Sequence, residues 1–438
     1  MTKPVIIKSK IKSFNKKISV PGDKSLSIRW VLFASIALGT SKAKNLLLSE
    51  DVLAAVGAIK KLGIKVKLDK KLCTIYGKGL NGYNYRENLI IDAKNSGTLG
   101  RLIMGLLVDS KYKIKIIGDK SLSKRDFNRI AKPLKKFGAR IKLTKNSLPL
   151  SIEGAQSLTP INHFENKGSA QIKSSIIFAG LKTPGKTFIK AKKSRNHTEL
   201  LCKYLKLPLK IENKTIHDYI EINQAKIIKP FNYDIPSDIS SSAFFIVLTT
   251  LTSNSKITIK NINVNPSRIG VIKILKKMGA KIQFKNKQKY KGEVLADIIV
   301  KSAEKLESIN CPTKWNSGAI DEFLVIFLVA AKAHGISHFK NLSELNQKES
   351  PRLKWGGKIL NEMGVKNIIT ENSIKIFGNP KLKINKKIII KNYLKDHRVF
   401  MASTIAALSF GGDWHIHDKD SIKTSFPNFL NTINDLRK

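Results

Sequence analysis

The stretch KKLGIKV, residues 60–66, decides how the rest of the chain is organised, because variants of it return along the sequence. Each copy joins the end of an amphipathic helix to a glycine that stops it and to the alternating start of a strand. The other copies are KKFGARI (135–141), KKMGAKI (276–282) and NEMGVK (361–366), and a degenerate copy, YLKLPLKI (204–211), has Leu-Pro in place of the glycine. Six units of roughly 73 residues would fill the 438-residue chain. The pattern therefore predicts a protein built from repeated α/β units.

A second pattern consists of segments that are apolar on nearly every side of a helix. Such helices must be buried all round, so we expect them at the centre of each domain, with amphipathic helices and sheets outside. The segments are residues 31–38, 102–108, 176–181, 243–251, 323–331 and 400–410. Dividing six units into two domains of three predicts one domain over residues 22–233. The second domain then comprises residues 1–21 and 234–438, with crossovers near Pro21 and near Tyr233–Ser237.

Composition places the chain among ordinary globular proteins, with 42% hydrophobic and 26% charged residues. Its cysteines, Cys73, Cys202 and Cys311, have no paired spacing, which indicates neither a disulfide framework nor a zinc site and fits a reducing cytosol. No apolar run is long enough to span a membrane. These features predict a soluble cytoplasmic protein.

The net charge is +48, from 80 Lys and Arg against 32 Asp and Glu, which raises the question of a nucleic-acid partner. The lysines are spread along the whole chain instead of forming one basic arm, and aromatic residues make up only 7%. No base-stacking platform is evident. We therefore expect no specific nucleic-acid partner, and a compositional drift toward lysine accounts for the surface.

Residues 20–30, VPGDKSLSIRW, lead into the first apolar helix. We expect Ser25 to cap this helix and Gly39 to end it. Lys24 and Arg29 would add fixed cations to a helix N-terminus that already favours anions. A plain capped helix with two solvated cations is the alternative interpretation.

Each of the other apolar helices also follows a short polar segment. If the helices of a domain are parallel, their N-termini emerge on one face and predict a pocket for a ligand with several phosphates or carboxylates. Helix capping alone is again the alternative. The segments are NSGT (95–98) with Arg101, SAQ (169–171) with Lys173, SDIS (237–240), IDE (320–322) and DHR (396–398), and further cations are Arg125, Arg352 and Arg398.

The segment QKESPRL, residues 347–353, carries another helix start. We expect Ser350 as the N-cap and Pro351 as the first helical residue. Glu349 is then a carboxylate flanked by cations, which suits either a proton-transfer group or a salt-bridged cap.

Taken in order, these motifs resemble those of the 5-enolpyruvylshikimate-3-phosphate synthases, and the resemblance runs from about Val20 to Phe429. The forms at residues 169–174 and 194–199 are similar to the class II branch of that family. The motifs are PGDKS-x-S-x-R, NSGT-x-x-R, SAQ-x-KS, SR-x-HTE, DISS-x-AFF, NP-x-R-x-G, IDEF, KES-x-R, DHR and TSFP.

The resemblance implies an α/β fold of two similar globular domains, each with three βαβαββ units around buried parallel helices. It also implies transfer of the carboxyvinyl group of phosphoenolpyruvate to the 5-hydroxyl of shikimate-3-phosphate, through a tetrahedral intermediate and with release of phosphate. This is a step of the shikimate pathway of aromatic amino-acid biosynthesis, and it uses neither a metal nor an organic cofactor. We expect a cytoplasmic monomer with these two small-molecule substrates as partners.

The resemblance also implies which residues form the site. Shikimate-3-phosphate would contact Lys24, Ser25, Arg29, Ser169, Ala170, Gln171, Arg195, Asp321 and Lys348. Phosphoenolpyruvate would contact Lys24, Gly97, Arg125, Gln171, Arg352 and Arg398. The arginines suit a carboxylate and a phosphate because their planar forks bind such groups bidentately.

The catalytic residues implied are Asp321 as base at the 5-hydroxyl, Glu349 as proton donor and acceptor at C3, and Lys24 as a further participant in proton transfer. Gly97 would leave room for glyphosate to compete with phosphoenolpyruvate. The chain departs from the family pattern in that a lysine, Lys94, replaces the usual glycine before Asn95. Other departures are Ile28, Asn196, Ser237, Asn346 and Pro351, and Lys423 lies one position from a phosphate-binding lysine of part of the family.

Two alternatives remain at this point. The sister carboxyvinyl transferases that act on UDP-N-acetylglucosamine carry a reactive cysteine in a mobile loop, and none of the three cysteines here lies in such a motif. A basic RNA-associated protein on the same scaffold would explain the charge but not the ordered motifs.

Overall fold

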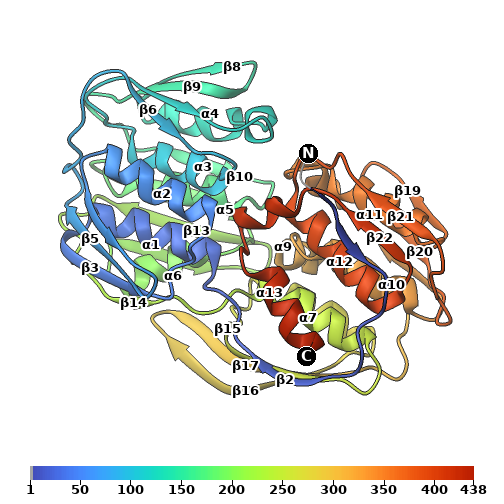
Figure 1. The fold of residues 1–438 in the computed structure, drawn as a ribbon. Coiled ribbons are helices and arrows are strands. Elements are labelled where there is room, and N and C mark those ends of the chain that lie inside the picture. Colours follow the sequence, from blue (N-terminus) through green and yellow to red (C-terminus); the bar gives the residue numbers. More distant parts are fainter. Residues whose placement is uncertain (1–2) are drawn as a thin grey trace. The chain divides into compact units, whose positions relative to one another are not determined.

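The computed structural model describes residues 3–438 and divides them into two compact units (Figure 1). Unit 2 comprises Gly22–Ile235 and Tyr290–Glu293, and unit 1 comprises the chain up to Pro21 together with Pro236–Lys289 and Val294–Lys438. The segment 290–293 is the tip of a hairpin whose strands otherwise belong to unit 1. Each unit therefore contains residues from more than one stretch of the sequence.

The sheets of unit 2 follow one plan, in which an edge strand runs parallel to its neighbour and the remaining strands pair antiparallel. The first sheet has the order β14 (Tyr233–Asp234), β3 (Leu38–Lys44), β5 (Leu72–Lys78), β4 (Lys65–Leu68). The second has the order β6 (Leu89–Asp92), β7 (Ile114–Ile117), β9 (Ser147–Glu153), β8 (Arg140–Thr144). The third has the order β10 (Asn162–Glu165), β11 (Lys186–Lys192), β13 (His217–Asn223), β12 (Leu209–Asn213). The common plan is what a repeated α/β unit requires.

In unit 1, strands from the start of the chain complete sheets formed by its later part. β2 (Asn15–Ile18) pairs parallel with β15 (Lys256–Asn263), and β1 (Val5–Ile7) pairs antiparallel with β22 (Asp413–Ile416). The first of these sheets continues through β17 (Glu293–Lys301) to β16 (Lys281–Tyr290), and the second ends with β21 (Lys387–Ile390). The third sheet has the order β18 (Ile336–Phe339), β20 (Ile374–Phe377), β19 (Asn367–Ile369).

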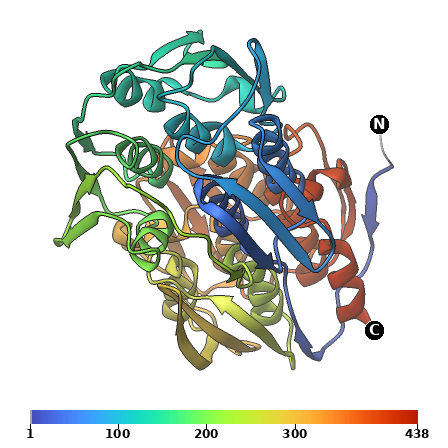
Figure 2. The same ribbon diagram turned by 90° about the vertical axis from the view of Figure 1, so that its left-hand side faces the viewer.

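The apolar helices lie at the centre of their units, as predicted. Every residue of α7 and of α12 is buried, and so is α1 from Leu26 to its end. Figure 2 shows the sheets of unit 2 (blue to green) arranged around the helices of that unit. These central helices are α1 (Lys24–Ile36), α3 (Gly97–Leu106) and α5 (Ala170–Gly180) in unit 2, and α7 (Ile239–Leu251), α10 (Phe323–Lys332) and α12 (His397–Phe410) in unit 1.

The glycines of the repeated phrase end helices, as predicted. Gly63, Gly138, Gly279 and Gly364 have φ angles of +84°, +108°, +98° and +78°, a conformation in which a Cβ is unfavourable. They follow α2 (Glu50–Lys61), α4 (Asn128–Lys136), α8 (Gly270–Lys277) and α11 (Arg352–Glu362), respectively. The remaining helical elements are α6 (His197–Tyr204), α9 (Asn316–Ala319), α13 (Phe429–Arg437), and the short 3₁₀ turns η1 (Leu122–Lys124), η2 (Thr313–Trp315), η3 (Ser343–Gln347) and η4 (Lys419–Thr424).

The predicted boundaries of two helices, α1 and α11, are wrong. Asp23, not Ser25, caps α1, because its carboxylate accepts a hydrogen bond of 2.9 Å from the backbone N–H of Leu26. The same helix ends at Ile36, and Gly39 lies in β3.

The second error concerns α11, which begins at Arg352 with Pro351 as its N-cap residue. The hydroxyl of Ser350 donates instead to the carboxylate of Asp396.

Among the described helices, none combines the length and the apolar character needed to cross a membrane.

Candidate active site

The first turn of α1 carries Lys24 and Ser25 in half-buried positions. The Lys24 ammonium group lies 2.9 Å from the carboxylate of Asp51, which stands in the first turn of α2. The Lys24 side chain is 17% exposed. The ion pair holds the lysine at the mouth of the helix, where the backbone N–H groups also favour an anion.

Arg29 joins three helix starts in unit 2. Its Nε donates to the hydroxyl of Thr198 in α6 (2.8 Å), and Nη2 donates to the hydroxyl of Ser174 in α5 (3.1 Å). Nη1 donates to the backbone oxygen of Ser25, one turn earlier in α1. The residue is only 3% exposed, so these contacts fix the guanidinium group in one position.

Gln171 links the starts of α3 and α5. Its amide nitrogen donates to the hydroxyl of Thr98 (3.1 Å), and its amide oxygen accepts from Nη1 of Arg101 (2.7 Å). The Arg101 guanidinium group in turn lies 5.0 Å from the ring centre of Phe127. Gln171 is therefore held from both ends of its amide group, and Arg101 is a supporting residue that the predicted site did not include.

Gly97 is the first residue of α3, directly after the cap residue Ser96. A Cβ atom at this position would lie 3.0 Å from a terminal nitrogen of Arg101 and 3.0 Å from one of Arg125. Arg125 also donates to the amide oxygen of Asn95 at 3.1 Å. The structure thus brings the predicted Gly97 and Arg125 together, and the glycine lets the guanidinium groups approach the backbone.

Ser169 and Ala170 form the start of α5, where the Ser169 hydroxyl accepts from the N–H of Ile172. The backbone N–H of Ser169 donates to the carboxylate of Glu165, which is 3% exposed. Burial raises the pKa of Glu165, against the lowering effect of the backbone N–H groups that it accepts. Glu165 fixes the loop before α5 and was not singled out from the sequence.

Arg195 lies two residues before the first residue of α6, next to the cap residue Asn196. The chain connects Arg195 through Asn196 to the first turn of α6, where the hydroxyl of Thr198 accepts from Arg29. Glu199, in the first turn of α6, forms a buried ion pair of 2.5 Å with Lys173 of α5. Apart from Arg125, which follows η1, the predicted residues of unit 2 thus stand in the first two turns of α1, α3 and α5 or just before α5 and α6, and side chains tie these helices to one another.

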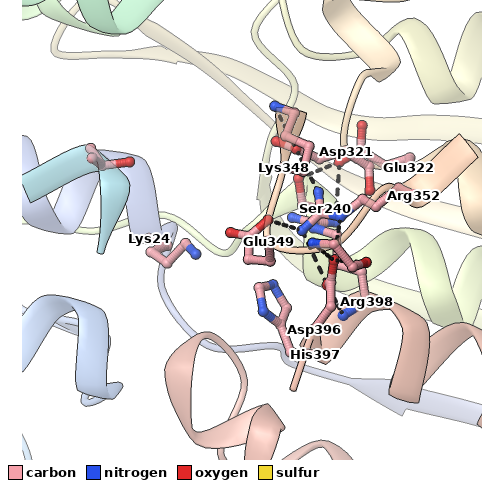
Figure 3. Close-up of polar contacts among 12 residues, drawn as sticks. Lys24, Ser240, Asp321, Glu322, Lys348, Glu349, Arg352, Asp396, His397 and Arg398 are labelled. Atoms are coloured by element: carbon pink, nitrogen blue, oxygen red, sulfur yellow. Dashed lines mark hydrogen bonds and ion pairs between the residues drawn. The ribbon is translucent and has the colours of Figure 1, made fainter. Parts of the chain in front are cut away.

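In unit 1, Arg352 lies in a ring of carboxylates (Figure 3). Its Nη1 is 3.1 Å from Asp321, its Nε is 2.9 Å from Asp396, and its Nη2 forms a short ion pair with Glu349. The side chain is 2% exposed. Burial works to lower the pKa of Arg352, but the carboxylates of Asp396, Glu349 and Asp321 outweigh it and raise this pKa. The guanidinium group is therefore firmly charged.

Lys348 adds a second cation to Asp321, with 3.2 Å between the ammonium and carboxylate groups. The backbone oxygen of Asp321 accepts from Nη1 of Arg398 at 2.8 Å. Asp321, Lys348, Glu349, Arg352 and Arg398, all predicted from the sequence, therefore form one cluster (Figure 3). Glu349 is salt-bridged to Arg352, and 13% of its side chain is exposed.

Asp396 holds this cluster together, and the predicted site did not include it. Its carboxylate accepts from the N–H and hydroxyl of Ser350, from Nε and Nη2 of Arg352, and from the N–H of Arg398. The side chain is fully buried. Its place as the cap residue of α12 was visible as an Asp before an apolar helix, but its contact with Arg352 was not.

Further supporting contacts surround Arg398 and the next residue of the same motif. Glu322, the cap residue of α10, lies 3.7 Å from Arg398 and accepts from the hydroxyl of Ser240. His397 is buried, and its Nδ1 lies 3.1 Å from the hydroxyl of Thr424, the first residue of the TSFP motif. Within residues 3–438, no three His, Cys, Asp or Glu side chains are grouped as ligands of one metal ion.

Comparison with known proteins gives this arrangement a family. The model of the family described as EPSP synthase (3-phosphoshikimate 1-carboxyvinyltransferase) matches residues 8–433. The chain belongs to the EPSP synthase family. Its relatives include the 3-phosphoshikimate 1-carboxyvinyltransferase of Ruthia magnifica subsp. Calyptogena magnifica, 39% identical over 96% of this chain and 94% of that protein. The enzyme of the same name from Caldicellulosiruptor bescii is 35% identical over 96% of each chain.

Solved structures agree with this assignment. An EPSP synthase of Acinetobacter baumannii superimposes with a TM-score of 0.86 at 35% identity, over 99% of this chain and 98% of that one. The enolpyruvyl transferase NikO of Streptomyces tendae gives a TM-score of 0.77 at 13% identity, over 100% and 98% of the two chains, which establishes a shared fold alone. The predicted fold class and the predicted family are therefore confirmed, and the chain is a carboxyvinyl transferase of the EPSP synthase family.

Proposed function

We propose that this EPSP synthase family member transfers the carboxyvinyl group of phosphoenolpyruvate to the 5-hydroxyl of shikimate-3-phosphate and releases phosphate. The observation that carries the proposal is that two carboxylates suited to proton transfer, Asp321 and Glu349, contact the same buried guanidinium group, Arg352. The reaction needs two such carboxylates, because one proton leaves the 5-hydroxyl oxygen and another is added to C3 of phosphoenolpyruvate. It also needs a cation, because phosphoenolpyruvate carries a carboxylate and a phosphate.

The cations bind phosphoenolpyruvate. Arg352, Arg398, Arg125 and Lys24 supply charge for its carboxylate and phosphate, with bidentate contacts from the arginines. Gly97 and Gln171 complete this set. Because Arg352 is buried and held by carboxylates, its charge is oriented before the substrate arrives, which reduces the cost of reorganisation.

Shikimate-3-phosphate is bound by residues at helix starts, together with Asp321 and Lys348. Its phosphate suits the N-terminus of α5 together with Arg195, where backbone N–H groups and a guanidinium group favour an anion. The contacts proposed are Lys24, Ser25, Arg29, Ser169, Ala170, Gln171, Arg195, Asp321 and Lys348.

The protons move through Asp321, Glu349 and Lys24. Asp321 accepts the proton of the 5-hydroxyl as the oxygen attacks C2 of phosphoenolpyruvate, and Glu349 delivers a proton to C3. Elimination of phosphate from the tetrahedral intermediate then returns a proton from C3 to Glu349. Lys24 also takes part in proton transfer, since it stands at the mouth of α1 with an accessible ammonium group.

The test is phosphate release by the purified protein with phosphoenolpyruvate and shikimate-3-phosphate, with UDP-N-acetylglucosamine as a parallel acceptor. We expect turnover with the shikimate acceptor alone, and a loss of about a thousandfold or more in Asp321→Asn. A matched control is Asp420→Asn, which alters an exposed carboxylate paired with Lys423. Turnover with the nucleotide sugar, or undiminished turnover in Asp321→Asn, would contradict the proposal.

We further propose that the protein acts as a monomer in the cytoplasm and without a specific nucleic-acid partner. The spread of lysines along the whole chain supports the last point. Sedimentation of the purified protein should give the mass of one chain. Turnover should be unchanged after nuclease treatment, and a loss of activity on removing RNA would contradict the proposal.

A further inference from the structure

The tip of the β16–β17 hairpin packs along α6, the helix that follows Arg195. The turn consists of Lys291 and Gly292, with φ angles of +49° and +89°, as a two-residue hairpin turn with both central residues left-handed requires. Residues 290–293 belong to unit 2, whereas the strands on either side belong to unit 1. A short piece of chain from elsewhere in the sequence therefore becomes part of the unit that carries Arg195.

Three successive residues of this tip meet one face of α6. Glu293 Oε1 lies 2.6 Å from His197 Nδ1, and a Cβ on Gly292 would lie 2.9 Å from the backbone oxygen of Leu200. The ammonium group of Lys291 lies 5.5 Å from the ring centre of Tyr204. Positions 197, 200 and 204 share a face because a helix has 3.6 residues per turn. The hairpin tip thus follows α6 from its first residue to its last.

The contact at the start of α6 involves groups that are removed from water. The side chains of His197 and Glu293 are 0% and 1% exposed. A carboxylate in such a place is costly unless a donor satisfies it, so the pair fixes both the tautomer and the orientation of the imidazole ring. Because His197 is the first helical residue, the pair also fixes the turn that contains Thr198, to which Arg29 donates.

We infer that Glu293 is a positioning residue for shikimate-3-phosphate binding, acting through His197 on the first turn of α6 and hence on Arg195 and Arg29. This inference rests on the proposed function, which assigns both arginines to that substrate. Glu293 touches neither substrate nor reacting atoms in this scheme. Its removal should therefore weaken the binding of shikimate-3-phosphate and leave the chemical step and phosphoenolpyruvate nearly unaffected.

The experiment measures the Kd for shikimate-3-phosphate by calorimetry without phosphoenolpyruvate, and then kcat and both KM values. In Glu293→Ala we expect the Kd and KM for shikimate-3-phosphate to rise about tenfold, with kcat and the KM for phosphoenolpyruvate within about threefold of the original. Glu293→Gln keeps a carbonyl oxygen that accepts from the imidazole N–H, so it should recover most of the loss. It also serves as the test variant if Glu293→Ala does not fold, and should then raise the Kd by about threefold.

The matched control is Tyr290→Phe on the same hairpin tip. It removes the hydroxyl that accepts from the backbone N–H of Asp234 (2.7 Å) and leaves the contact with His197 in place. We expect its Kd for shikimate-3-phosphate to stay unchanged. A Kd within twofold of the original in folded Glu293→Ala, or an equal loss in Tyr290→Phe, would overturn the inference.

Arg195→Ala separates this inference from the proposed function on which it rests. If the unaltered protein does not bind shikimate-3-phosphate, or if Arg195→Ala binds it normally, the proposed function fails and the inference fails with it. If Arg195→Ala loses binding while Glu293→Ala keeps it, only the inference fails.

Discussion

Replacement of Asp396 by asparagine tests how far one buried carboxylate supports the cluster around Arg352. The fully buried carboxylate accepts two hydrogen bonds from Ser350, two from Arg352 and one from the N–H of Arg398. The amide of the Asp396→Asn variant would keep one oxygen as an acceptor but would lose the charge and would present N–H groups to Arg352. Breaking one side of a buried ion pair costs about 3–5 kcal/mol, and the retained oxygen favours the lower end, about 3 kcal/mol in the free energy of unfolding.

The assay is thermal unfolding followed by steady-state kinetics. For a domain of about 200 residues, a loss of about 3 kcal/mol corresponds to a fall in Tm of roughly 6–12 °C. Because Arg352 loses the partner of its Nε, the KM for phosphoenolpyruvate should rise about tenfold or more, since a charged hydrogen bond contributes about 1.5–3 kcal/mol.

The control is Asp420→Asn, which removes an exposed ion pair of 2.8 Å with Lys423. Exposed pairs contribute about 0–1 kcal/mol, so Tm should change by no more than about 4 °C. An Asp396→Asn protein that melts like the original and binds phosphoenolpyruvate equally well would refute the reasoning, because the carboxylate would then be replaceable by a neutral amide.

Three further predictions concern single positions. Gly97→Ala should raise the KM for phosphoenolpyruvate and weaken inhibition by glyphosate, because its Cβ would lie 3.0 Å from the terminal nitrogens of two arginines; equal inhibition curves for the two proteins would count against this. Lys94→Gly should raise the free energy of unfolding by about 0.5–1 kcal/mol, since Lys94 has a φ angle of +52° and glycine adopts this conformation without strain. Urea unfolding measures this free energy, and a variant less stable than the original would contradict the prediction. Burial raises the pKa of Cys73 and Cys311 to about 12 and raises that of Cys202 as well, so the thiolate forms only at pH values well above 8. None of the three should react with iodoacetamide in the folded protein at pH 8, and mass spectrometry that finds rapid labelling would support the rival that uses a reactive cysteine.

The features of the fold that the sequence predicted are local ones. The glycine that follows an amphipathic helix takes a left-handed conformation, which depends on its neighbours along the chain. A helix that is apolar on every side is predicted to be buried from its own residues alone. The pairing of β1 with β22 and of β2 with β15 has no such local signal, because the partners lie at opposite ends of the chain. β2, β15 and β22 alternate between more and less exposed residues, as many other strands of this chain do.

Errors of one or two residues in the helix starts have a definite cause. Asp23 and Ser25 are both good capping residues, and the choice between them depends on which side chain reaches the free N–H groups of the first turn. In α1 the carboxylate of Asp23 caps the helix, because it accepts a hydrogen bond from the N–H of Leu26. Ser350 does not cap α11, because its hydroxyl donates to the charged carboxylate of Asp396.

The motifs contain the charged residues that are predicted to bind a ligand, but they do not identify the residues that hold those side chains in position. Asp396 shares a motif with Arg398, yet its role as the cap of α12 explains its presence completely and gives no reason to look for Arg352. Glu293 lies in none of the motifs, and the tip of the β16–β17 hairpin places it beside His197 within unit 2. Both are carboxylates with at most 1% of the side chain exposed, which a chain keeps only where a donor compensates the loss of water. Buried carboxylates that contact other site residues are therefore where variants should separate the orientation of a substrate-binding cation from its charge.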